Sequence, residues 1–484
     1  MELGKCSGRF LCVLLLCVAG RMSAQTFTVL TSLSSVAPPG GGGNQVWSLV
    51  QGLGGNFYGT TEGGGGICAN NPFATCGTVY KVTPAGKLTV IHEFCQNNCT
   101  DGGAPYSGLI LSPSGNFYGT TTQDLVNHGG TVYSITPSGT VTSLHSFTGG
   151  NGEGTPYGPV IEANGSFYGI TALGGSAGDG TTYRLAANGT LTTLHTFTGS
   201  NGDQVGLVPE GLLQAPSGNF YGVTPYGTLN SNTCGTIFRT TPSGASTALY
   251  KFANTSAQGC GPADGLVIGA DGNIYGTAVG GGTANDGTIF KMAPTGALTV
   301  LYNFCSESDC ADGSMPNAGM ILGTDGNFYG TTIFGGASND GTIFQLTPGG
   351  TFKVLYSFCS RFGCSDGESS YSGLMQATDG NFYGTTSDGG GSQNGGTVFK
   401  LSMGLAPFVR SLPGSGKAGA QVKILGTDLT GATGVTFDGI AATFKVETPT
   451  FIVATVPAGA HMGKIKVKTP GGILVSDVAF LVLP

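Results

Sequence analysis

The segment Asn56-Phe-Tyr-Gly-Thr-Thr61 decides the fold of this chain, because near-copies of it recur through four-fifths of the 484 residues. The other copies begin at Asn116, Ser166, Asn219, Asn273, Asn327 and Asn381, so successive steps are 60, 50, 53, 54, 54 and 54 residues. A regular period of this size is typical of one supersecondary unit repeated in tandem. The sequence therefore predicts one repeat architecture in place of the three domains that length alone would suggest.

Each repeat contains four short apolar segments, rich in Val, Ile, Thr, Phe and Tyr and bounded by Gly, Pro, Asn or Asp. The first resembles Tyr106–Leu111, and the second is the tag itself. The third opens with Gly-Thr-Val/Ile-Tyr/Phe, as at Gly130, and the fourth resembles Thr351–Phe358. These segments indicate strands, and none has a sustained helical period. Four strands per repeat in seven copies predict an all-β, seven-bladed β-propeller.

The two ends of the repeat region distinguish a closed ring from an open solenoid. The seventh repeat runs through Gly396–Ser402 and then stops without its fourth strand. Residues Thr26–Leu33, near the start of the chain, match the pattern of Thr351–Phe358. Joining the two ends would complete the last blade and remove the open edges that a solenoid exposes. We therefore expect the N-terminal strand to close the ring.

The first 24 residues form a separate segment. Lys5 and Arg9 precede the apolar run Phe10–Ala19, and Ala24 offers a small residue before a cut at Gln25. This pattern predicts a secretory signal peptide over residues 1–24, because the run is too short and wrongly flanked for a membrane span. We expect a secreted, cell-surface or periplasm-facing protein that does not span the membrane.

Ten of the 13 cysteines lie after the signal segment, and an even number in an exported chain favours disulfides. Zinc binding is the alternative, but no His or second Cys pair stands at a ligand-like spacing. The close pairs predicted to form bridges are Cys68/Cys76, Cys95/Cys99, Cys305/Cys310 and Cys359/Cys364, and the remaining two are Cys234 and Cys260.

The blade plan sorts the connections onto two faces. Turns after strands one and three are short and uniform, and we call their side the tight-turn face. Connections after strands two and four hold all ten cysteines and nearly all the length variation, and we call their side the loop-rich face. Variable loops on a rigid scaffold are where binding usually occurs. The candidate binding residues there, each followed by Gly, are Asp101, Asp264, Asp286, Asp312, Asp340 and Asp366.

These Asp-Gly loops offer hard oxygen ligands, so calcium is an alternative interpretation, although the full spacing of a calcium loop is missing. Asp, Asn and Gly are also ordinary turn residues, and we predict no cofactor. His92, His145 and His195 share one position in strand four, where later repeats have Tyr250, Tyr302 and Tyr356. A position that accepts both His and Tyr fills a structural place, so we predict no catalytic residue. The repeated Tyr of the tag is expected to pack between blades, with sugar stacking as the alternative.

The composition changes at residue 404. Residues 404–484 carry a net charge of +3, whereas 25–403 carry −12, which disfavours nucleic acid as a partner. Alternating apolar segments with spaced turns predict a small β-sandwich. The Gly-Thr-Asp-Leu turn at 426–429, Val435-Thr-Phe-Asp-Gly439 and Thr455-Val-Pro-Ala-Gly459 resemble an IPT/TIG immunoglobulin-like domain, which implies a spacer or interaction module and no catalysis.

The repeats at 25–403 resemble the GloVer repeat family of exported bacterial proteins, whose units carry Gly-Asn-Phe-Tyr-Gly-Thr-Thr followed by Gly-Thr-Val-Phe. The family implies the fold but no activity. We therefore expect an exported, non-enzymatic propeller that recognises a glycan or an extracellular protein. The alternatives are a polysaccharide hydrolase or lyase, which needs two carboxylates ~5–10 Å apart, and a structural surface-layer component. Acids converging in a central pocket would favour the enzyme.

Overall fold

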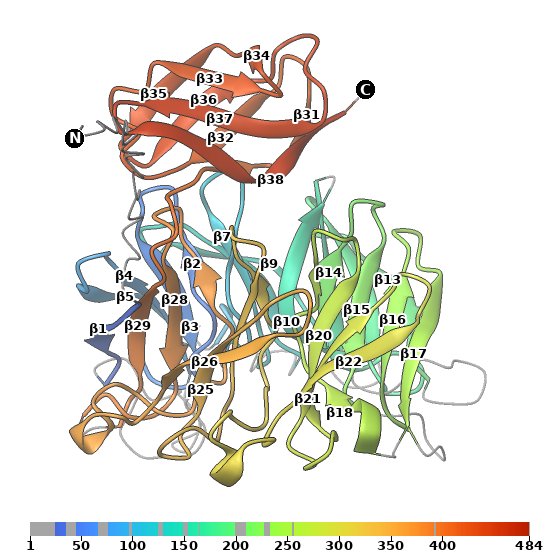
Figure 1. Ribbon diagram of the computed structural model, residues 1–484. Coiled ribbons are helices and arrows are strands. Elements are labelled where there is room, and N and C mark those ends of the chain that lie inside the picture. Colours follow the sequence, from blue (N-terminus) through green and yellow to red (C-terminus); the bar gives the residue numbers. More distant parts are fainter. Residues whose placement is uncertain are drawn as a thin grey trace, which may run out of the picture.

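The computed structural model describes residues 25–34, 45–65, 76–95, 99–123, 129–148, 153–163, 165–198, 210–226, 233–253, 256–391 and 394–483. These residues form an all-β structure of nine sheets, seven from the repeats and two from the C-terminal segment (Figure 1). The described helices are three single turns, η1 (Ser256–Gln258), η2 (Ser308–Cys310) and η3 (Phe362–Cys364). Over the same residues, no helix has the length and apolar character needed to cross a bilayer.

We number the repeat sheets by the copy of the tag that each contains. Sheet 1 contains β2 (Val50–Gln51), β3 (Phe57–Thr61), β4 (Thr78–Val82) and β5 (Leu88–Glu93), and sheet 2 contains β6 (Ile110–Leu111), β7 (Phe117–Thr121), β8 (Thr131–Ile135) and β9 (Val141–Ser146). Sheet 3 contains β10 (Thr155–Ala163), β11 (Ser166–Leu173), β12 (Thr181–Ala186) and β13 (Leu191–Thr196), and sheet 4 contains β14 (Glu210–Gln214), β15 (Phe220–Thr224), β16 (Thr233–Thr240) and β17 (Ser246–Ala253). Sheet 5 contains β18 (Cys260–Pro262), β19 (Val267–Ile268), β20 (Ile274–Gly280), β21 (Thr288–Met292) and β22 (Leu298–Asn303), and sheet 6 contains β23 (Ile321–Leu322), β24 (Phe328–Thr331), β25 (Thr342–Leu346) and β26 (Phe352–Ser357).

Sheet 7 joins the two ends of the repeat region. It contains β27 (Met375–Gln376), β28 (Phe382–Thr386), β29 (Thr397–Ser402) and the N-terminal strand β1 (Thr26–Ser32). Strand β1 pairs antiparallel with β29, with Thr26 opposite Ser402. Phe27 of β1 stacks on Tyr356 with ring centroids 3.7 Å apart, as Phe352 stacks on Tyr302 at 3.8 Å. The N-terminal strand therefore takes the place of the missing fourth strand of the seventh repeat.

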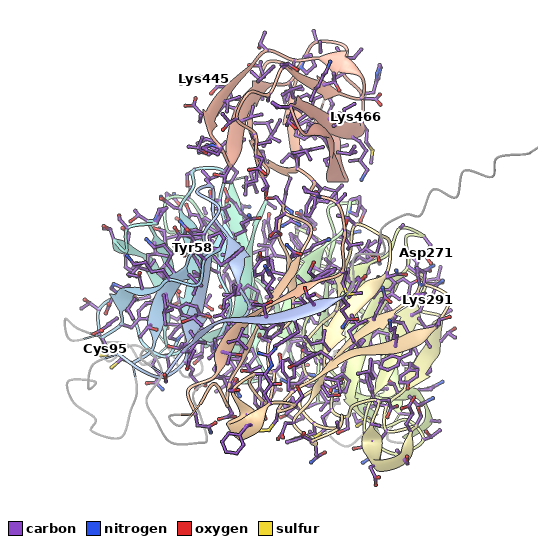
Figure 2. The ribbon with its side chains drawn as sticks, turned by 60° about the vertical axis from the view of Figure 1, so that its left-hand side comes forward. Tyr58, Cys95, Asp271, Lys291, Lys445 and Lys466 are labelled. Carbon is purple, nitrogen blue, oxygen red and sulfur yellow. A yellow bond between two sulfur atoms is a disulfide. The ribbon has the colours of Figure 1, made fainter. Side chains whose placement is uncertain are left out.

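Aromatic rings of the tag link each sheet to the next. The Tyr of one copy packs on the Phe of the following copy, with ring centroids between 4.1 and 4.5 Å apart. These pairs are Tyr58–Phe117, Tyr118–Phe167, Tyr168–Phe220, Tyr275–Phe328, Tyr329–Phe382 and Tyr383–Phe57. The last pair returns from sheet 7 to sheet 1, and Figure 2 labels Tyr58 inside this packed region. The predicted packing role of the tag Tyr is confirmed at these positions.

The Gly and the second Thr of the tag also have fixed roles within each sheet. Gly59 lies opposite Tyr80 in the register of β3 and β4, and an added Cβ would overlap the Tyr80 ring. The hydroxyl of Thr61 lies 2.8 Å from that of Thr78 across the same strands. Where Ala278 replaces this Thr in sheet 5, its partner Thr288 keeps a buried hydroxyl without a hydrogen bond in the described structure.

The junction between sheets 4 and 5 departs from this scheme. Ile274 stands in place of the tag Phe, so Tyr221 packs on an aliphatic side chain there. Val223 replaces the first Thr, whose equivalent Thr60 donates a hydrogen bond to the Ser107 carbonyl of the next sheet at 2.6 Å. A disulfide between Cys234 and Cys260 crosses this junction. A disulfide therefore links these two sheets where the Tyr–Phe contact and the Thr hydrogen bond are both missing.

The C-terminal segment forms two sheets over one apolar core. One sheet contains β30 (Arg410–Leu412), β32 (Gln421–Leu425), β36 (Phe451–Thr455) and β35 (Phe444–Thr448). The other contains β31 (Ser415–Lys417), β38 (Gly472–Leu483), β37 (Gly463–Thr469), β33 (Gly434–Phe437) and β34 (Ile440–Ala441). Side chains from both sheets, including Ile424, Ile452, Phe437 and Ile465, are fully or almost fully buried together.

These C-terminal sheets lie against the tight-turn face of the repeat sheets, at the top of Figure 1. Thr450 Oγ1 donates to the Leu53 carbonyl at 2.6 Å, and Lys423 Nζ donates to the Ser114 carbonyl at 3.0 Å. The Phe408 amide donates to the Thr378 carbonyl at 2.9 Å. The acceptors lie in the turns between the first and second strands of sheets 1, 2 and 7. The C-terminal segment thus covers part of the tight-turn face.

Replacing Tyr80 by Phe should stabilise the protein. The hydroxyls of Tyr80, Tyr133 and Tyr183 are buried without a described hydrogen-bond partner, and later repeats have Phe there. Removing an unsatisfied buried hydroxyl should raise the free energy of unfolding by about 0.5–1 kcal/mol in chemical denaturation. The control is Tyr329→Phe, which should lose about 1 kcal/mol because Asp325 accepts from this hydroxyl at 2.8 Å and Gln345 donates to it at 2.7 Å. A loss from Tyr80→Phe equal to the control would contradict this assignment.

Removing the disulfide between sheets 4 and 5 should open their junction. The double variant Cys234→Ser/Cys260→Ser should lose about 2–4 kcal/mol and exchange amide hydrogens faster along β15 and β20. The control variant, Cys305→Ser/Cys310→Ser, removes a bridge between residues only five apart. The control variant should lose less free energy of unfolding, and its amide hydrogens should exchange faster only at residues 305–313. Equal exchange in β15 and β20 for the two variants would refute a special role for this junction.

Candidate functional site

The loop-rich face carries disulfides at the connections that follow the fourth strands. The structure pairs Cys95 with Cys99, Cys305 with Cys310 and Cys359 with Cys364. Figure 2 shows Cys95 at the end of the sheets opposite the C-terminal segment. Both cysteines of each pair have positive φ, a backbone conformation that non-glycine residues rarely adopt.

Cys76 is the position where the predicted disulfides and the described ones differ. Cys76 is buried and disulfide-bonded, and its carbonyl accepts from the Ala104 amide at 2.9 Å. The predicted bridge between Cys68 and Cys76 is not among the described disulfides, however, because Cys68 lies outside the described residues. The pairing of Cys76 with Cys68 therefore stays a prediction, in contrast to the three close pairs that the structure bridges.

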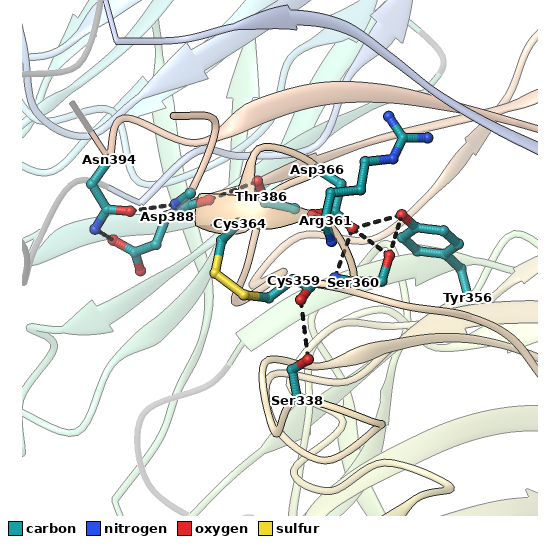
Figure 3. Close-up of a disulfide and its surroundings, with 11 residues drawn as sticks. Ser338, Tyr356, Cys359, Ser360, Arg361, Cys364, Asp366, Thr386, Asp388 and Asn394 are labelled. Carbon is teal, nitrogen blue, oxygen red and sulfur yellow. Dashed lines mark hydrogen bonds between the residues drawn. A yellow bond between two sulfur atoms is a disulfide. The ribbon is translucent and has the colours of Figure 1, made fainter. Parts of the chain in front are cut away.

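Two of these disulfide loops each contain a buried carboxylate that accepts hydrogen bonds from the loop. Figure 3 shows Asp366 beside the Cys359–Cys364 bridge, where its Oδ2 accepts from Tyr356 Oη at 2.6 Å and from Ser360 Oγ at 2.7 Å. Burial opposes ionisation, but the hydrogen bonds from Tyr356 and Ser360 outweigh it and lower the pKa of Asp366. Asp312 is also fully buried and accepts from Tyr302 Oη at 2.7 Å. Both carboxylates are therefore used inside their own loops.

The loop acids pair with the side chain at the fourth-strand position that is His in some repeats and Tyr in others. Asp101 accepts from the Cys95 amide at 3.1 Å, and its Oδ2 lies 2.8 Å from His92 Nε2. Glu153, which the sequence did not single out, lies 3.1 Å from His145 Nε2 in the next repeat. Glu153 is followed by Gly154, as Asp101 is followed by Gly102, and this shared position before the first strand could have identified Glu153 from the sequence. The shared geometry supports the structural interpretation of this position.

Asp286 and Asp340 lie beside the same two disulfide loops, Cys305–Cys310 and Cys359–Cys364. Oxygen and sulfur atoms of Asp340, Cys359, Cys364 and Glu368 lie within 4.8 Å of one another, and Asp286 forms a similar group with Cys305 and Cys310. Burial raises the pKa of Asp340. Burial and the nearby carboxylates of Asp340 and Asp388 raise the pKa of Glu368. The sulfurs are bound in disulfides, so the first group offers two carboxylates, fewer oxygens than calcium requires.

A central cavity is formed where the first strands of all seven repeats begin. Its volume is 450 Å³. The repeats contribute, in order, Trp47, Tyr106, Tyr157, Leu212, Asp264, Asn317 and Tyr371, together with neighbouring residues. These residues lie at the loop-rich end of their strands. At the tight-turn end, Leu412 and Pro413 of the C-terminal segment lie beside Leu111 and Val160.

Asp264 is the one predicted binding residue that lines the central cavity, and its neighbours separate it from the loop acids. Burial raises the pKa of its carboxyl, and a hydrogen bond from the Gly265 backbone opposes this shift. Glu210 occupies the equivalent position in the preceding repeat, but its side chain is outside the described part of the chain. Among described side chains, the cavity therefore has a single carboxylate, and the loop acids do not converge in it.

Several solved structures are distantly similar to this chain, and no curated protein matches it. A puromycin hydrolase has 11% identity over 92% of this chain and 60% of its own, with a TM-score of 0.47. PorZ, a surface component of the type-IX secretion system of Porphyromonas gingivalis, has 11% identity, 93% and 60% coverage and a TM-score of 0.44. A putative 6-phosphogluconolactonase from Bacteroides uniformis has 16% identity, 66% and 87% coverage and a TM-score of 0.42. Similarities this low transfer neither ligand nor activity.

The repeats themselves give a specific match. The family model described as the Gloeobacter/Verrucomicrobia repeat matches residues 20–208, 126–321 and 208–442, three overlapping stretches that cover most of the chain. This chain therefore belongs to the Gloeobacter/Verrucomicrobia repeat family.

Proposed function

We propose that this protein is a closed seven-bladed β-propeller followed by an IPT/TIG-type immunoglobulin-like sandwich, and that its loop-rich face binds a glycan or an extracellular protein. Seven sheets of four or five strands, the pairing of β1 with β29 and the Tyr383–Phe57 contact support the closed ring. Two sheets around one core support the sandwich. The domains would be 25–403 and 404–484, with residues 1–24 as a signal peptide outside the described residues.

The proposal depends on a difference between the two faces: one is partly covered by the C-terminal segment, and the other presents stiffened loops. The C-terminal segment covers part of the tight-turn face through contacts to Leu53, Ser114 and Thr378. The opposite face presents loops whose backbone is held by disulfides and by carboxylates such as Asp366. Rigid loops lose little conformational entropy on binding, so they suit recognition of a large partner. The sandwich would then act as a spacer or a second docking module.

An exported location is part of the proposal. Four disulfides among the described residues are expected in an oxidising compartment and uncommon in a cytosolic one. Calcium at the Asp286 and Asp340 loops would need further oxygen ligands from water or from the bound partner, and the comparison of calcium with EDTA in the pull-down tests for it. Asp312 and Asp366 support the binding face from inside, whereas Asp101, Asp286 and Asp340 are partly exposed on it.

A hydrolase or lyase is the second candidate, and the cavity is the place to test it. Glycoside hydrolysis with two carboxylates needs a partner for Asp264, and Glu210 holds the equivalent position in the adjacent repeat. Release of reducing ends from a polysaccharide by the wild-type protein, abolished in Glu210→Gln, would favour the enzyme over the binding protein.

Polysaccharide pull-down with residues 25–484 tests the binding function. We expect retention on at least one member of a panel of bacterial and plant polysaccharides, measured with calcium and with EDTA. Phe362, the first residue of η3, is fully exposed, so Phe362→Ala should weaken binding about tenfold, as for an aromatic contact residue. The control is Ile473→Ala on the sandwich, where Ile473 is 64% exposed. No retention on glycans and no protein captured from a cell-surface fraction would reject the proposal.

The carboxylate support of the loops predicts a pH dependence. Because the folded pKa of Asp366 is lowered, its contribution is fully present above its unfolded pKa of about 3.9 and is lost as pH falls through the lower folded value. Amide exchange at Ser360 and Arg361, corrected for intrinsic rates, should therefore accelerate only below about pH 4.

In Asp366→Asn, exchange at Ser360 and Arg361 should already be about tenfold faster at pH 7 and should no longer depend on pH. Asp309→Asn, which changes an exposed acid in an equivalent loop, is the control and should behave as wild type. Unchanged exchange in Asp366→Asn at pH 7 would show that the carboxylate does not hold the loop.

A further inference from the structure

The central cavity has one continuous aromatic wall. Trp47 and Tyr106 have ring centroids 4.6 Å apart, and Tyr106 and Tyr157 are 4.7 Å apart. Tyr371 of sheet 7 lines the same cavity, so four consecutive repeats around the ring each place an aromatic residue there. All four side chains retain partial exposure. The rings therefore pack against one another while part of their surface faces the cavity.

Asp264 stands in the part of the cavity formed by the other repeats. Gly211 of the neighbouring strand leaves the space for its carboxylate, because a Cβ at Gly211 would overlap Asp264 Oδ1. The described residues that line the cavity include no Lys, Arg or His, and the described ion pairs do not involve Asp264. Burial raises the pKa of this carboxyl, as expected for an acid without a compensating charge.

These two walls favour one class of ligand. The negative face of an aromatic ring attracts a cation, and quaternary ammonium groups are recognised by several such rings together. A carboxylate that is partly removed from water without a counter-charge is costly, so a cation placed near it gains a second favourable interaction. A metal ion would require more oxygen ligands than one carboxylate supplies. A neutral sugar would stack on the rings but leave Asp264 uncompensated.

We propose that the central cavity binds a small organic ammonium group between the aromatic wall of Trp47, Tyr106 and Tyr157 and the carboxylate of Asp264. A cavity of 450 Å³ lies in the range of small-molecule sites. This site is separate from the binding surface proposed for the loops, so either one can fail without the other. The ammonium group can belong to a free small molecule or to a lysine side chain.

Trp47 is the only tryptophan in the chain, so its fluorescence reports on this cavity. Residues 25–484 would be titrated with choline, with Nα-acetyl-lysine amide and with 3,3-dimethylbutan-1-ol, the neutral isostere of choline. Saturable binding of choline or the lysine derivative, at least about tenfold tighter than that of the isostere, is expected. The stronger of the two cations identifies the source of the ammonium group. Equal affinity for choline and the isostere, or no saturable change with either cation, would overturn the proposal.

Two variants separate the contributions of the walls. Asp264→Asn and Tyr106→Ala should each weaken cation binding about tenfold, and Asp264→Asn should leave binding of the isostere unchanged. Asp309→Asn, at η2 and outside the residues that line the cavity, is the charge-matched control and should bind as wild type. Isothermal calorimetry supplies the affinities independently of fluorescence. If Asp264→Asn folds, as judged by its melting temperature, and binds choline as tightly as wild type, the carboxylate has no such role. The comparison of choline with its isostere decides the proposal even if this variant does not fold.

Discussion

The packing of a tag Tyr on the next tag Phe is the contact on which the repeat structure depends. Successive residues of a strand point to opposite faces, so the adjacent Phe and Tyr of one copy reach the sheets on its two sides. Each aromatic pair adds about 0.5–1.5 kcal/mol beyond the area it buries. Because Tyr383 reaches Phe57, the same contact that joins neighbours also joins the last repeat to the first. A strand that must satisfy both neighbours is constrained to nearly the same sequence in every copy.

The exception between sheets 4 and 5 shows how that constraint can be relaxed. Ile274 cannot stack as Phe does, and Val223 cannot donate the hydrogen bond that Thr60 makes. The Cys234–Cys260 bridge crosses the same junction. Cys234 and Cys260 occupy the repeat positions where Asp340 and Glu368 approach each other two sheets later. One pair of repeat positions therefore serves as a covalent link in one junction and as a carboxyl pair in another.

The candidate sites follow from the same scaffold. The first strands of the seven repeats begin close together, so side chains from all seven repeats meet in one cavity. The loops at that end vary, and each is stabilised by its own short network, such as Tyr356–Asp366–Ser360 (Figure 3). Similar Asp-Gly dipeptides serve different purposes there. Asp312 and Asp366 are buried and accept hydrogen bonds within their own loops, whereas Asp264 lines the cavity.

Four features could be predicted from the sequence: the four-strand unit, the placement of β1 beside β29, the packing role of the tag Tyr and the structural role of the His/Tyr position. These features repeat, and a repeated pattern reports the contacts that every copy must make. Three features required the folded structure: which Asp-Gly carboxylates are internal, the pairing of Glu153 with His145 as Asp101 pairs with His92, and the single wall formed by Trp47, Tyr106 and Tyr157. Residues from different repeats meet in that wall, and their distances depend on how the sheets are placed around the cavity. No local pattern encodes that placement, because it arises from all the contacts between sheets together.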